Sequence, residues 1–230
     1  MAHRDYAKKY PSVTTILDVL SKKGLEYYWK SNTPEFIEQE SAKSKAIGTQ
    51  VHEVFQKHIE AEKITFETEY PEEVKNIINS FFKFKQEYPN VKLKRAELKM
   101  ESDKYGVNGT CDCIAHEDNQ LVLLDWKSSK CYVGEVVKTG VHKGESKEID
   151  KPKIYPEYLY QTVWYSYLYY DVFKEPINKC RIVVMAKDKV AYDTITIDDR
   201  IMANIFQNAC LPALQLFNVQ KEIKSILKGE

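Results

Sequence analysis

The sequence lacks any stretch of the roughly 18 to 20 consecutive apolar residues that a membrane-spanning helix requires. It also lacks an apolar leader for secretion and a recognisable transit segment at its N-terminus. Its cysteines number only five, an odd count that does not suit a disulfide framework. These absences predict a protein with reduced cysteines and no membrane or secretion signal, in the cytoplasm of a bacterium or a virus-infected host cell.

An excess of one charge sign is also missing, because 34 lysines and arginines balance 34 aspartates and glutamates. Proteins that bind nucleic acid usually carry a basic excess. A metal-dependent nuclease, however, uses carboxylates at its active site, so a neutral total does not exclude a basic binding face. The chain has no internal repeat, and its 230 residues are enough to bury the core of one domain spanning residues 1–230.

Hydrophobic spacing predicts a helical N-terminal part, residues 11–88, followed by a catalytic sheet, residues 91–127. Within the first part we expect helices over 11–30, from about Gly48 to 59, and over 71–88. Shorter, partly alternating segments at 92–101, 105–116 and 120–127 predict an antiparallel meander that turns at Asp118-Asn119.

The second half of the chain begins with a charged stretch, residues 130–153, which we interpret as a long loop. A helix of about 17 residues from Pro156 and two strands follow within residues 156–197. A C-terminal helix over 199–227 is expected, capped by Asp198 or Asp199 and kinked or ended by Pro212. This order predicts an α/β or α+β domain with a mixed central sheet flanked by helices.

The most informative segment is LVLLDWKSSK, residues 121–130. Alternate side chains of a strand face the same way, so Asp125 and Lys127 project together from the end of a buried apolar run. Their burial requires compensation, which a divalent cation on the carboxylate and a water or phosphate on the ammonium would supply. An isolated Asp-x-Lys pair would more often be exposed on an edge strand.

The segment GTCDC, residues 109–113, adds a second carboxylate. A hairpin through Asp118-Asn119 brings Asp112 alongside Asp125 on the neighbouring strand. Two adjacent carboxylates repel each other unless a cation neutralises them. Gly109 would allow a phosphate or another backbone to approach closely.

These residues resemble the PD-(D/E)xK nuclease superfamily, in which an acidic residue, a strand and Asp-x-Lys follow one another. The RecB-type branch adds an upstream Gly-x-x-x-His and a downstream Gln-x-x-x-Tyr. The chain carries all of these motifs in order: Gly48-Thr-Gln-Val-His52, Glu97, residues 109–112, Asp125-Trp126-Lys127 and Gln161-Thr-Val-Trp-Tyr165.

The resemblance extends from about residue 11 to residue 200, and it is closest to the mitochondrial genome maintenance exonuclease family and its phage and bacterial relatives. Those proteins also open with a Pro-Ser-Val-Thr segment, as at residues 11–14, and have an Ile-Val-Val strand like residues 182–184. It implies a restriction-endonuclease-like core with a mixed sheet.

The resemblance implies that His52, Asp112 and Asp125 are metal ligands, joined by the backbone carbonyl of Trp126. Lys127 would orient the attacking water. Mixed nitrogen and oxygen ligation suits one or two Mg²⁺ or Mn²⁺ ions. Zinc is disfavoured because no cysteine pair or second histidine has ligand spacing. Without the other motifs, His52 would be interpreted as a half-buried helical histidine.

Five further residues have roles implied by the resemblance. Glu97 is expected to be linked to the metal, although it also fits a solvated strand charge. Gln161 and Tyr165 share a helix face and would meet the scissile strand or Lys127, although most aromatic residues of that helix must serve packing. Ser12 and Thr14 would line the nucleic-acid path, although helix capping explains them equally well; these form the set Glu97, Gln161, Tyr165, Ser12 and Thr14.

Some RecB-type nucleases hold an iron–sulfur cluster through one early cysteine and three late ones. This chain has no cysteine before Cys111 and only Cys210 late, which predicts no cluster. Cys111 and Cys113 flank Asp112 and are expected to point away from it, as small apolar residues. The lysines of the 130–153 loop either contact phosphates of a single strand or are simply solvated: Lys138, Lys143, Lys147, Lys151 and Lys153, with His142.

The sequence thus predicts a metal-dependent DNA exonuclease that hydrolyses phosphodiester bonds of single-stranded DNA or flaps from a free end. Three alternatives stay open. The first is a structure-specific endonuclease or RNase on the same scaffold. The second is a DNA-binding or recombination partner that does not cleave. The third is an interaction module that uses its tyrosine-rich helix to form a toroidal oligomer or to contact a DNA-processing protein.

Overall fold

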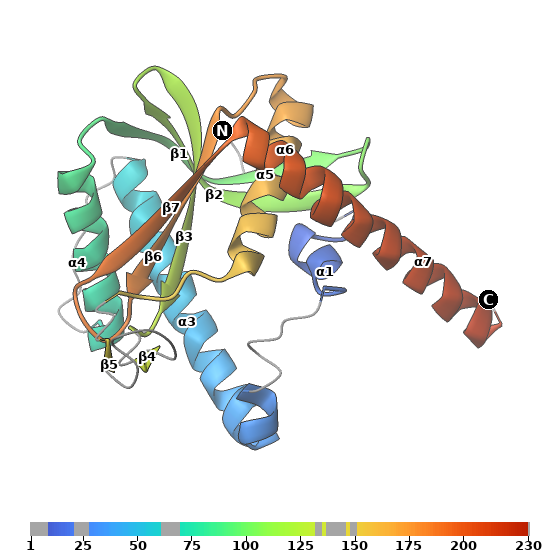
Figure 1. The fold of residues 1–230 in the computed structure, drawn as a ribbon, viewed down its shortest axis with the longest axis horizontal. Helices are drawn as coiled ribbons and strands as arrows, with labels where there is room; N and C mark the ends of the chain where they lie inside the picture. The colour runs from blue at the N-terminus through green and yellow to red at the C-terminus, as the bar shows by residue number, and fades with distance from the viewer. Residues whose placement is uncertain are drawn as a thin grey trace.

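The structure is a computed structural model that describes residues 9–20, 28–60, 70–131, 135–136, 146–147 and 151–229, the two short strands by backbone alone. Its helices and strands alternate in an α/β order (Figure 1). Their bounds are α1 Val13–Leu17, α3 Pro34–Ile59, α4 Glu72–Glu87, β1 Val91–Ser102, β2 Val107–Glu117, β3 Gln120–Ser129, β4 Glu135–Val136, β5 Ser146–Lys147, α5 Pro156–Phe173, β6 Lys179–Ala186, β7 Tyr192–Asp198, α6 Asp199–Ile205, the π-helical segment Phe206–Cys210 and α7 Leu211–Lys228.

A five-stranded sheet in the order β1-β2-β3-β6-β7 forms the centre of the molecule. β3 and β6 run parallel, and the other neighbouring strands are antiparallel. The parallel pair needs a crossover, which α5 supplies. The predicted mixed sheet flanked by helices is therefore confirmed.

Helices cover the sheet on both faces. α3 and α4 pack on one face, where their apolar residues join Leu124 and Trp126 of β3. α1, α5, α6 and the start of α7 pack on the other, where they join Leu123. Because side chains alternate along a strand, Asp125 and Lys127 face α5.

The β2–β3 hairpin turns at Asp118 and Asn119, whose φ values are 49° and 64°. Two consecutive positive φ values are typical of a type I′ turn, which matches the twist of antiparallel strands. The ladder pairs Cys113 with Leu124, and the same register continued by one residue sets Asp112 opposite Asp125. The predicted hairpin and the predicted alignment of the two carboxylates are both observed.

The helix that carries His52 begins well before the predicted start near Gly48. α3 starts at Pro34, after Thr33 caps it by accepting a hydrogen bond from the Phe36 backbone N–H. The prediction was wrong because the first half of α3 is exposed and has no apolar stripe. Its glutamate, glutamine, lysine and alanine residues nevertheless favour a helix.

The helix predicted over residues 11–30 is present only in part. α1 spans Val13–Leu17, residues 28–31 are helical, and residues 21–27 lie outside the described residues. The long loop predicted at 130–153 contains β4 and β5, which pair with each other. Lys138, His142 and Lys143 of that loop lie outside the described residues, as does the side chain of Lys147.

The C-terminal helix does not end at Pro212. Asp198 caps it, as predicted, by accepting a hydrogen bond from the Ile201 backbone N–H. The π-helical segment Phe206–Cys210 precedes Pro212, and α7 continues to Lys228. A π-bulge is one way in which a helix accommodates a residue that lacks a backbone N–H.

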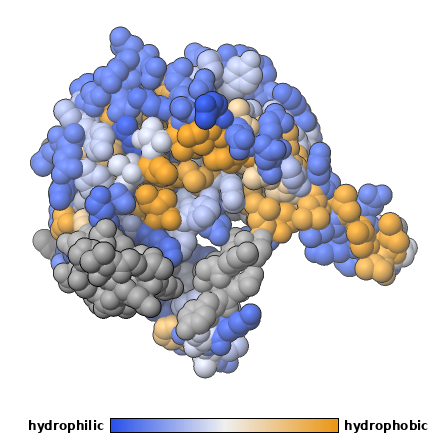
Figure 2. Space-filling view, in the orientation of Figure 1, coloured by the Kyte–Doolittle hydropathy of each residue, from blue (hydrophilic) through white to orange (hydrophobic). Residues whose placement is uncertain are grey.

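α7 extends away from the body of the molecule, with apolar residues on its surface (Figures 1 and 2). Its exposed apolar residues are Leu216, Val219, Ile223, Ile226 and Leu227. Among the residues that the structure describes, no helix combines the length and hydrophobicity that crossing a membrane requires.

A buried ion-pair cluster joins β2 to β6 at the end of the sheet far from Asp125. The Glu117 carboxylate lies 2.9 Å from Arg181 Nη2 and 2.6 Å from Lys179 Nζ. The Arg181 guanidinium stacks over the Tyr88 ring at 4.7 Å. Burial alone would raise the pKa of Glu117, but hydrogen bonds from Lys179 and Arg181 lower it below its usual value.

We expect Glu117→Gln to reduce the free energy of unfolding at pH 7 by about 3 kcal/mol, because it leaves the buried Arg181 and the half-buried Lys179 without their anion. The folded-state pKa of Glu117 is depressed. Its contribution is therefore full above the unfolded-state pKa of about 4.3 and is lost as the pH falls through the folded-state pKa. Urea unfolding of both proteins should show a constant difference from pH 7 to about pH 5 and a shrinking one as the pH is lowered further, toward about pH 2.

The matched control is Glu53→Gln, which breaks an ion pair between two exposed side chains, Glu53 and Lys57. We expect it to change stability by no more than about 0.5 kcal/mol. Equal effects of the two substitutions would contradict the assigned role of Glu117.

Candidate active site

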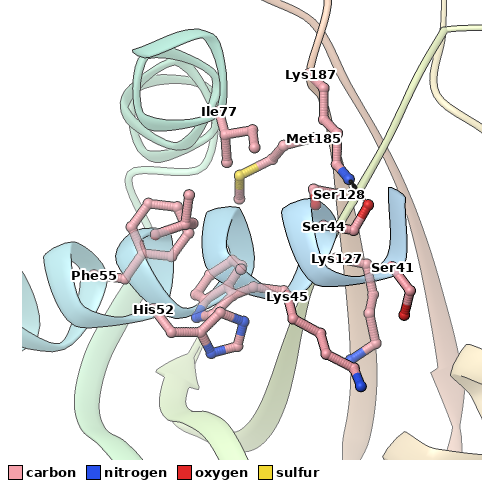
Figure 3. Close-up of a pocket in the computed structure, with 13 residues that line it drawn as sticks. Ser41, Ser44, Lys45, His52, Phe55, Ile77, Lys127, Ser128, Met185 and Lys187 are labelled. Atoms are coloured by element: carbon pink, nitrogen blue, oxygen red, sulfur yellow. Dashed lines mark hydrogen bonds between the residues drawn. The ribbon is translucent and has the colours of Figure 1, made fainter. Parts of the chain in front are cut away.

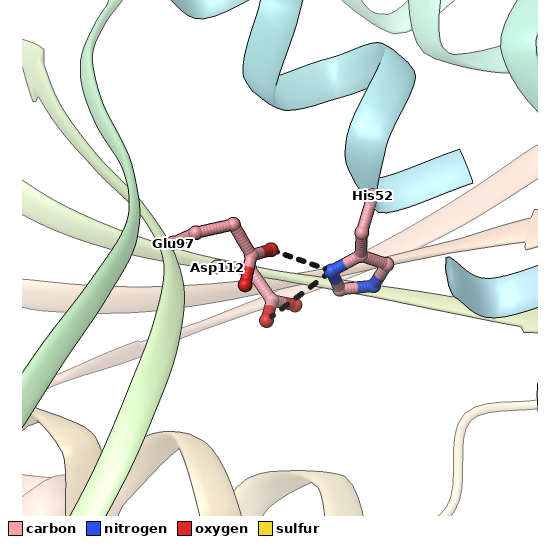
Figure 4. A group of neighbouring side chains, drawn as sticks. All are labelled: His52, Glu97 and Asp112. Atoms are coloured by element: carbon pink, nitrogen blue, oxygen red, sulfur yellow. Dashed lines mark hydrogen bonds and ion pairs between the residues drawn. The ribbon is translucent and has the colours of Figure 1, made fainter. Parts of the chain in front are cut away.

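Three side chains that could hold a metal ion meet where α3 crosses β1 and β2 (Figure 4). His52 Nδ1 lies 2.8 Å from Glu97 Oε1 and 3.7 Å from Asp112 Oδ1. One ligand atom from each residue lies within 4.8 Å of the others. Burial alone would lower the pKa of His52, but the hydrogen bond with Glu97 and the charge of Asp112 raise it.

Backbone irregularity in β1 directs Glu97 into this group. Glu97 has a φ of 47°, a left-handed conformation that is unfavourable for a residue with a side chain. It lies between Ala96 and Leu98, which pair with Cys113 and Cys111, so it stands opposite Asp112. The strained residue thus sets a third acidic side chain beside the two ligands.

Asp125 and Lys127 form a buried ion pair next to this group. Lys127 Nζ lies 2.5 Å from Asp125 Oδ2 and 4.0 Å from Asp112 Oδ2. Asp125 is fully buried, and burial raises the pKa of its carboxyl above the usual range, against the attraction of Lys127. Burial alone would lower the pKa of Lys127, but the charges of Asp125 and Asp112 raise it.

Asp112 is held by the neighbouring strand. Its Oδ2 accepts a hydrogen bond of 2.7 Å from the Trp126 backbone N–H. The Trp126 indole lies on the opposite face of the sheet, edge-on to three phenylalanine rings, with centroids 5.4 to 5.8 Å away: Phe55, Phe81 and Phe84. A rigid aromatic cluster therefore fixes the backbone that orients Asp112.

The residues present fit a divalent cation. One imidazole and three carboxylates form a mixed nitrogen and oxygen donor set suited to Mg²⁺ or Mn²⁺. Asp125 Oδ2 pairs with Lys127, but Oδ1 is buried without a partner among the described residues. A buried carboxylate oxygen left without a partner is expected where a cation completes the site. The side chain whose ligand atom lies close to those of His52 and Asp112 is that of Glu97, rather than that of Asp125.

Cys111 and Cys113 flank Asp112 and are both buried in apolar packing, as predicted. Cys111 belongs to the cluster under α5, whereas Cys113 belongs to the cluster under α3 and α4. Burial raises the pKa of both thiols. The absence of an iron–sulfur cluster stays a prediction.

Gln161 and Tyr165 lie one turn apart on α5 and contact each other. Gln161 Nε2 donates to the Tyr165 hydroxyl at 2.7 Å. Burial raises the pKa of Tyr165, with Lys127 acting in the opposite direction. The pair therefore lies near the lysine, as the resemblance implies, and its role toward DNA stays a prediction.

Gly109 makes room for Tyr165, which corrects the expectation that a phosphate or a backbone approaches there. A Cβ built on Gly109 would lie 2.7 Å from Tyr165 Cε1 and 3.3 Å from Leu168 Cδ1. The aromatic ring is buried and has no space to move aside.

We expect Gly109→Ala to lower the free energy of unfolding by about 1–3 kcal/mol, because the methyl group would overpack the Tyr165 ring. It should also displace the Gln161–Tyr165 pair from its place near Lys127. Thermal unfolding measures the first effect. Gly48→Ala is the matched control, since a Cβ there meets nothing within 4 Å. It should be neutral or stabilising by up to about 1 kcal/mol. An unchanged melting temperature for Gly109→Ala would refute the packing argument.

Ser12 and Thr14 lie outside the metal-ligating group. Ser12 Oγ accepts a hydrogen bond from the Thr15 backbone N–H and so caps α1. Its hydroxyl is also 2.8 Å from Thr14 Oγ1. Helix capping accounts for Ser12 in this structure, and its contact with DNA stays a prediction.

A pocket of about 320 Å³ adjoins the site between α3 and the ends of β3 and β6 (Figure 3). Sequence reasoning missed its polar lining: Ser41, Ser44, Lys45, Ser128 and Lys187. Four of the lining residues lie on one face of α3, where they recur at three- or four-residue spacing: Ser41, Lys45, Gly48 and His52. That signal becomes readable only once α3 is known to begin at Pro34.

Comparisons with known proteins add little to this geometry. No family model matches the chain, and no curated protein does. The crystal structure of SSO0001 is 13% identical, with 94% of this chain and 79% of that chain covered and a TM-score of 0.32. An alkaline exonuclease (LHK-Exo) from Laribacter hongkongensis is 12% identical, with 95% of both chains covered and a TM-score of 0.38. At these scores the function must be argued from the site itself.

Proposed function

We propose that the chain is a metal-dependent DNA exonuclease of the PD-(D/E)xK superfamily, in its RecB-type branch. It would hydrolyse phosphodiester bonds of single-stranded DNA or flaps from a free end. The observation that carries the proposal is the convergence of His52, Glu97 and Asp112 on the buried Asp125–Lys127 pair. The requirement for a free end and the preference for single strands come from the motif resemblance.

The proposed ligands are His52, Asp112 and Asp125 with the Trp126 carbonyl, and the observed geometry adds Glu97. One or two Mg²⁺ or Mn²⁺ ions, when bound, supply positive charge that polarises the phosphate and acidifies water. Glu97 accepts from the His52 ring if Nδ1 carries the proton, which would fix the orientation of the imidazole.

Lys127 remains protonated because Asp125 and Asp112 raise its pKa, and so it acts as a fixed positive charge. An ammonium 2.5 Å from Asp125 and 4.0 Å from Asp112 can hold the attacking water, or a phosphate oxygen, beside both carboxylates. The Asp112 carboxylate stays oriented through its hydrogen bond from the Trp126 N–H. The α5 helix packs over this face of the sheet.

Cleavage of DNA is the direct test of the proposed activity. With Mg²⁺ or Mn²⁺, the protein should degrade end-labelled linear single-stranded DNA and leave a circular single strand intact. Lys127→Ala and Lys127→Met should lower the rate by a factor of roughly 100 or more, because they remove a preorganised charge. Circular dichroism of each variant reports whether it is folded. The control is Lys92→Ala, because Lys92 is an exposed lysine at the start of β1.

The possible results separate the alternatives. Cleavage of the circular strand would identify an endonuclease, and cleavage of RNA alone would identify an RNase. Intact DNA and RNA under all conditions, with DNA still bound, would favour a partner that does not cleave.

Metal binding can be measured separately, by calorimetric titration of the protein with Mn²⁺ in the absence of DNA. His52→Ala and Asp112→Asn should each weaken binding at least roughly tenfold. Glu97→Gln should weaken it as strongly if Glu97 is a ligand, and less if it acts through His52. His116→Ala serves as the control, because His116 is exposed on the same strand as Asp112. Unchanged Mn²⁺ affinity in the His52 variant would reject the proposed centre.

A further inference from the structure

The pocket beside the candidate active site continues into a second hollow. This second hollow has a volume of about 620 Å³ and shares Ser41 and Lys45 with the first. Its other lining residues are Trp29, Asn32, Pro34, Ile37, Glu38 and Ala42. A continuous groove therefore runs from His52 and Lys127 along the N-terminal half of α3 to Trp29.

The part of the groove next to the active site is basic. Figure 3 shows Lys45 and Lys127 extending toward the same side of the pocket. Lys187 is half-buried, and its Nζ donates to Ser44 Oγ at 3.2 Å. No carboxylate lines this pocket among the described residues. Burial, reinforced by the charge of Lys130, lowers the pKa of Lys187.

The far part of the groove offers an aromatic surface. Trp29 is 50% exposed, whereas Trp126 and Trp164 are 2% and 0% exposed. An exposed indole beside a basic channel suits the stacking of a nucleobase, since every base has an aromatic face. One exposed carboxylate, that of Glu38, also lines this part.

We propose that this groove binds single-stranded DNA next to the scissile phosphate, with Lys45 and Lys187 holding a neighbouring phosphate and Trp29 stacking on a base. The proposal rests on the proposed nuclease function for the position of the scissile phosphate. It explains why two lysines besides Lys127, together with three serine hydroxyls, line a pocket that contains none of the acidic ligands: Ser41, Ser44, Ser128, Lys45 and Lys187.

Intrinsic fluorescence tests the aromatic contact directly, because Trp29 is exposed and both other tryptophans are buried. The full chain is titrated with an oligothymidine strand in EDTA, so that binding is measured without cleavage. We expect the strand to quench the emission, and we expect Trp29→Phe to bind with nearly native affinity but without this quenching.

A second arm uses an abasic strand of the same length. Trp29→Ala should bind oligothymidine roughly tenfold more weakly than the native chain, as expected for loss of one stacked base. The Trp29→Ala variant and the native chain should bind the abasic strand with the same affinity. Tyr170→Ala is the matched control, because Tyr170 is also 50% exposed but lies on α5. It should change neither affinity.

The salt dependence of binding tests the two lysines. Each phosphate contact on a single strand adds about 0.7 to the slope of log affinity against log salt. Lys45→Gln and Lys187→Gln should therefore each reduce that slope by about 0.7. Lys224→Gln, on the projecting α7, should leave it unchanged.

Separate outcomes bear on the groove and on the nuclease proposal. Metal-dependent cleavage with unaltered quenching and unaltered salt slopes in the variants would overturn the groove and leave the nuclease standing. The expected binding effects without any cleavage would support the groove and reject the nuclease. If the native chain does not bind the strand at all, the proposed DNA-binding role of the groove is also overturned.

Discussion

A fully buried carboxylate, that of Asp125, requires compensation, and the Lys127 ammonium 2.5 Å away is the cation beside it. Charges in an apolar interior are tolerated when they are paired or bind a cation. Both residues lie in the second half of β3, the central strand of the sheet, with α5 over them. The surrounding structure determines how this pair is enclosed, and therefore how the other acidic residues can approach it.

Two features bring the remaining ligands to that pair. The aromatic cluster around Trp126 anchors α3 and α4 to the sheet, and the backbone N–H of Trp126 donates a hydrogen bond to Asp112. The left-handed backbone at Glu97 turns a third carboxylate toward His52. Strain of this kind persists only where the surrounding packing enforces it, and it is concentrated at functional sites. Rigid packing between α3, α4 and the sheet thus fixes both the backbone that orients Asp112 and the helix that carries His52.

Much of this arrangement was predictable from sequence. The meander, the Asp118-Asn119 turn and the alignment of Asp112 with Asp125 follow from strand alternation, which acts locally. The start of α3 was not predictable in the same way, because its exposed first half has no hydrophobic period. The φ of Glu97 and the packing of Tyr165 against Gly109 depend on tertiary contacts, which no local pattern encodes. The basic lining of the groove was missed for the same reason.

The parallel pairing of β3 with β6 has a consequence for how the chain folds. β6 can join the sheet only after the long connection through α5 has closed, whereas β1, β2 and β3 pair through short turns. Contacts between residues far apart in sequence form slowly, because the loop entropy must be overcome first. The meander is thus expected to form early, with the Asp125 strand as an open edge. The acidic residues would become enclosed only late in folding, when the crossover helix docks over them.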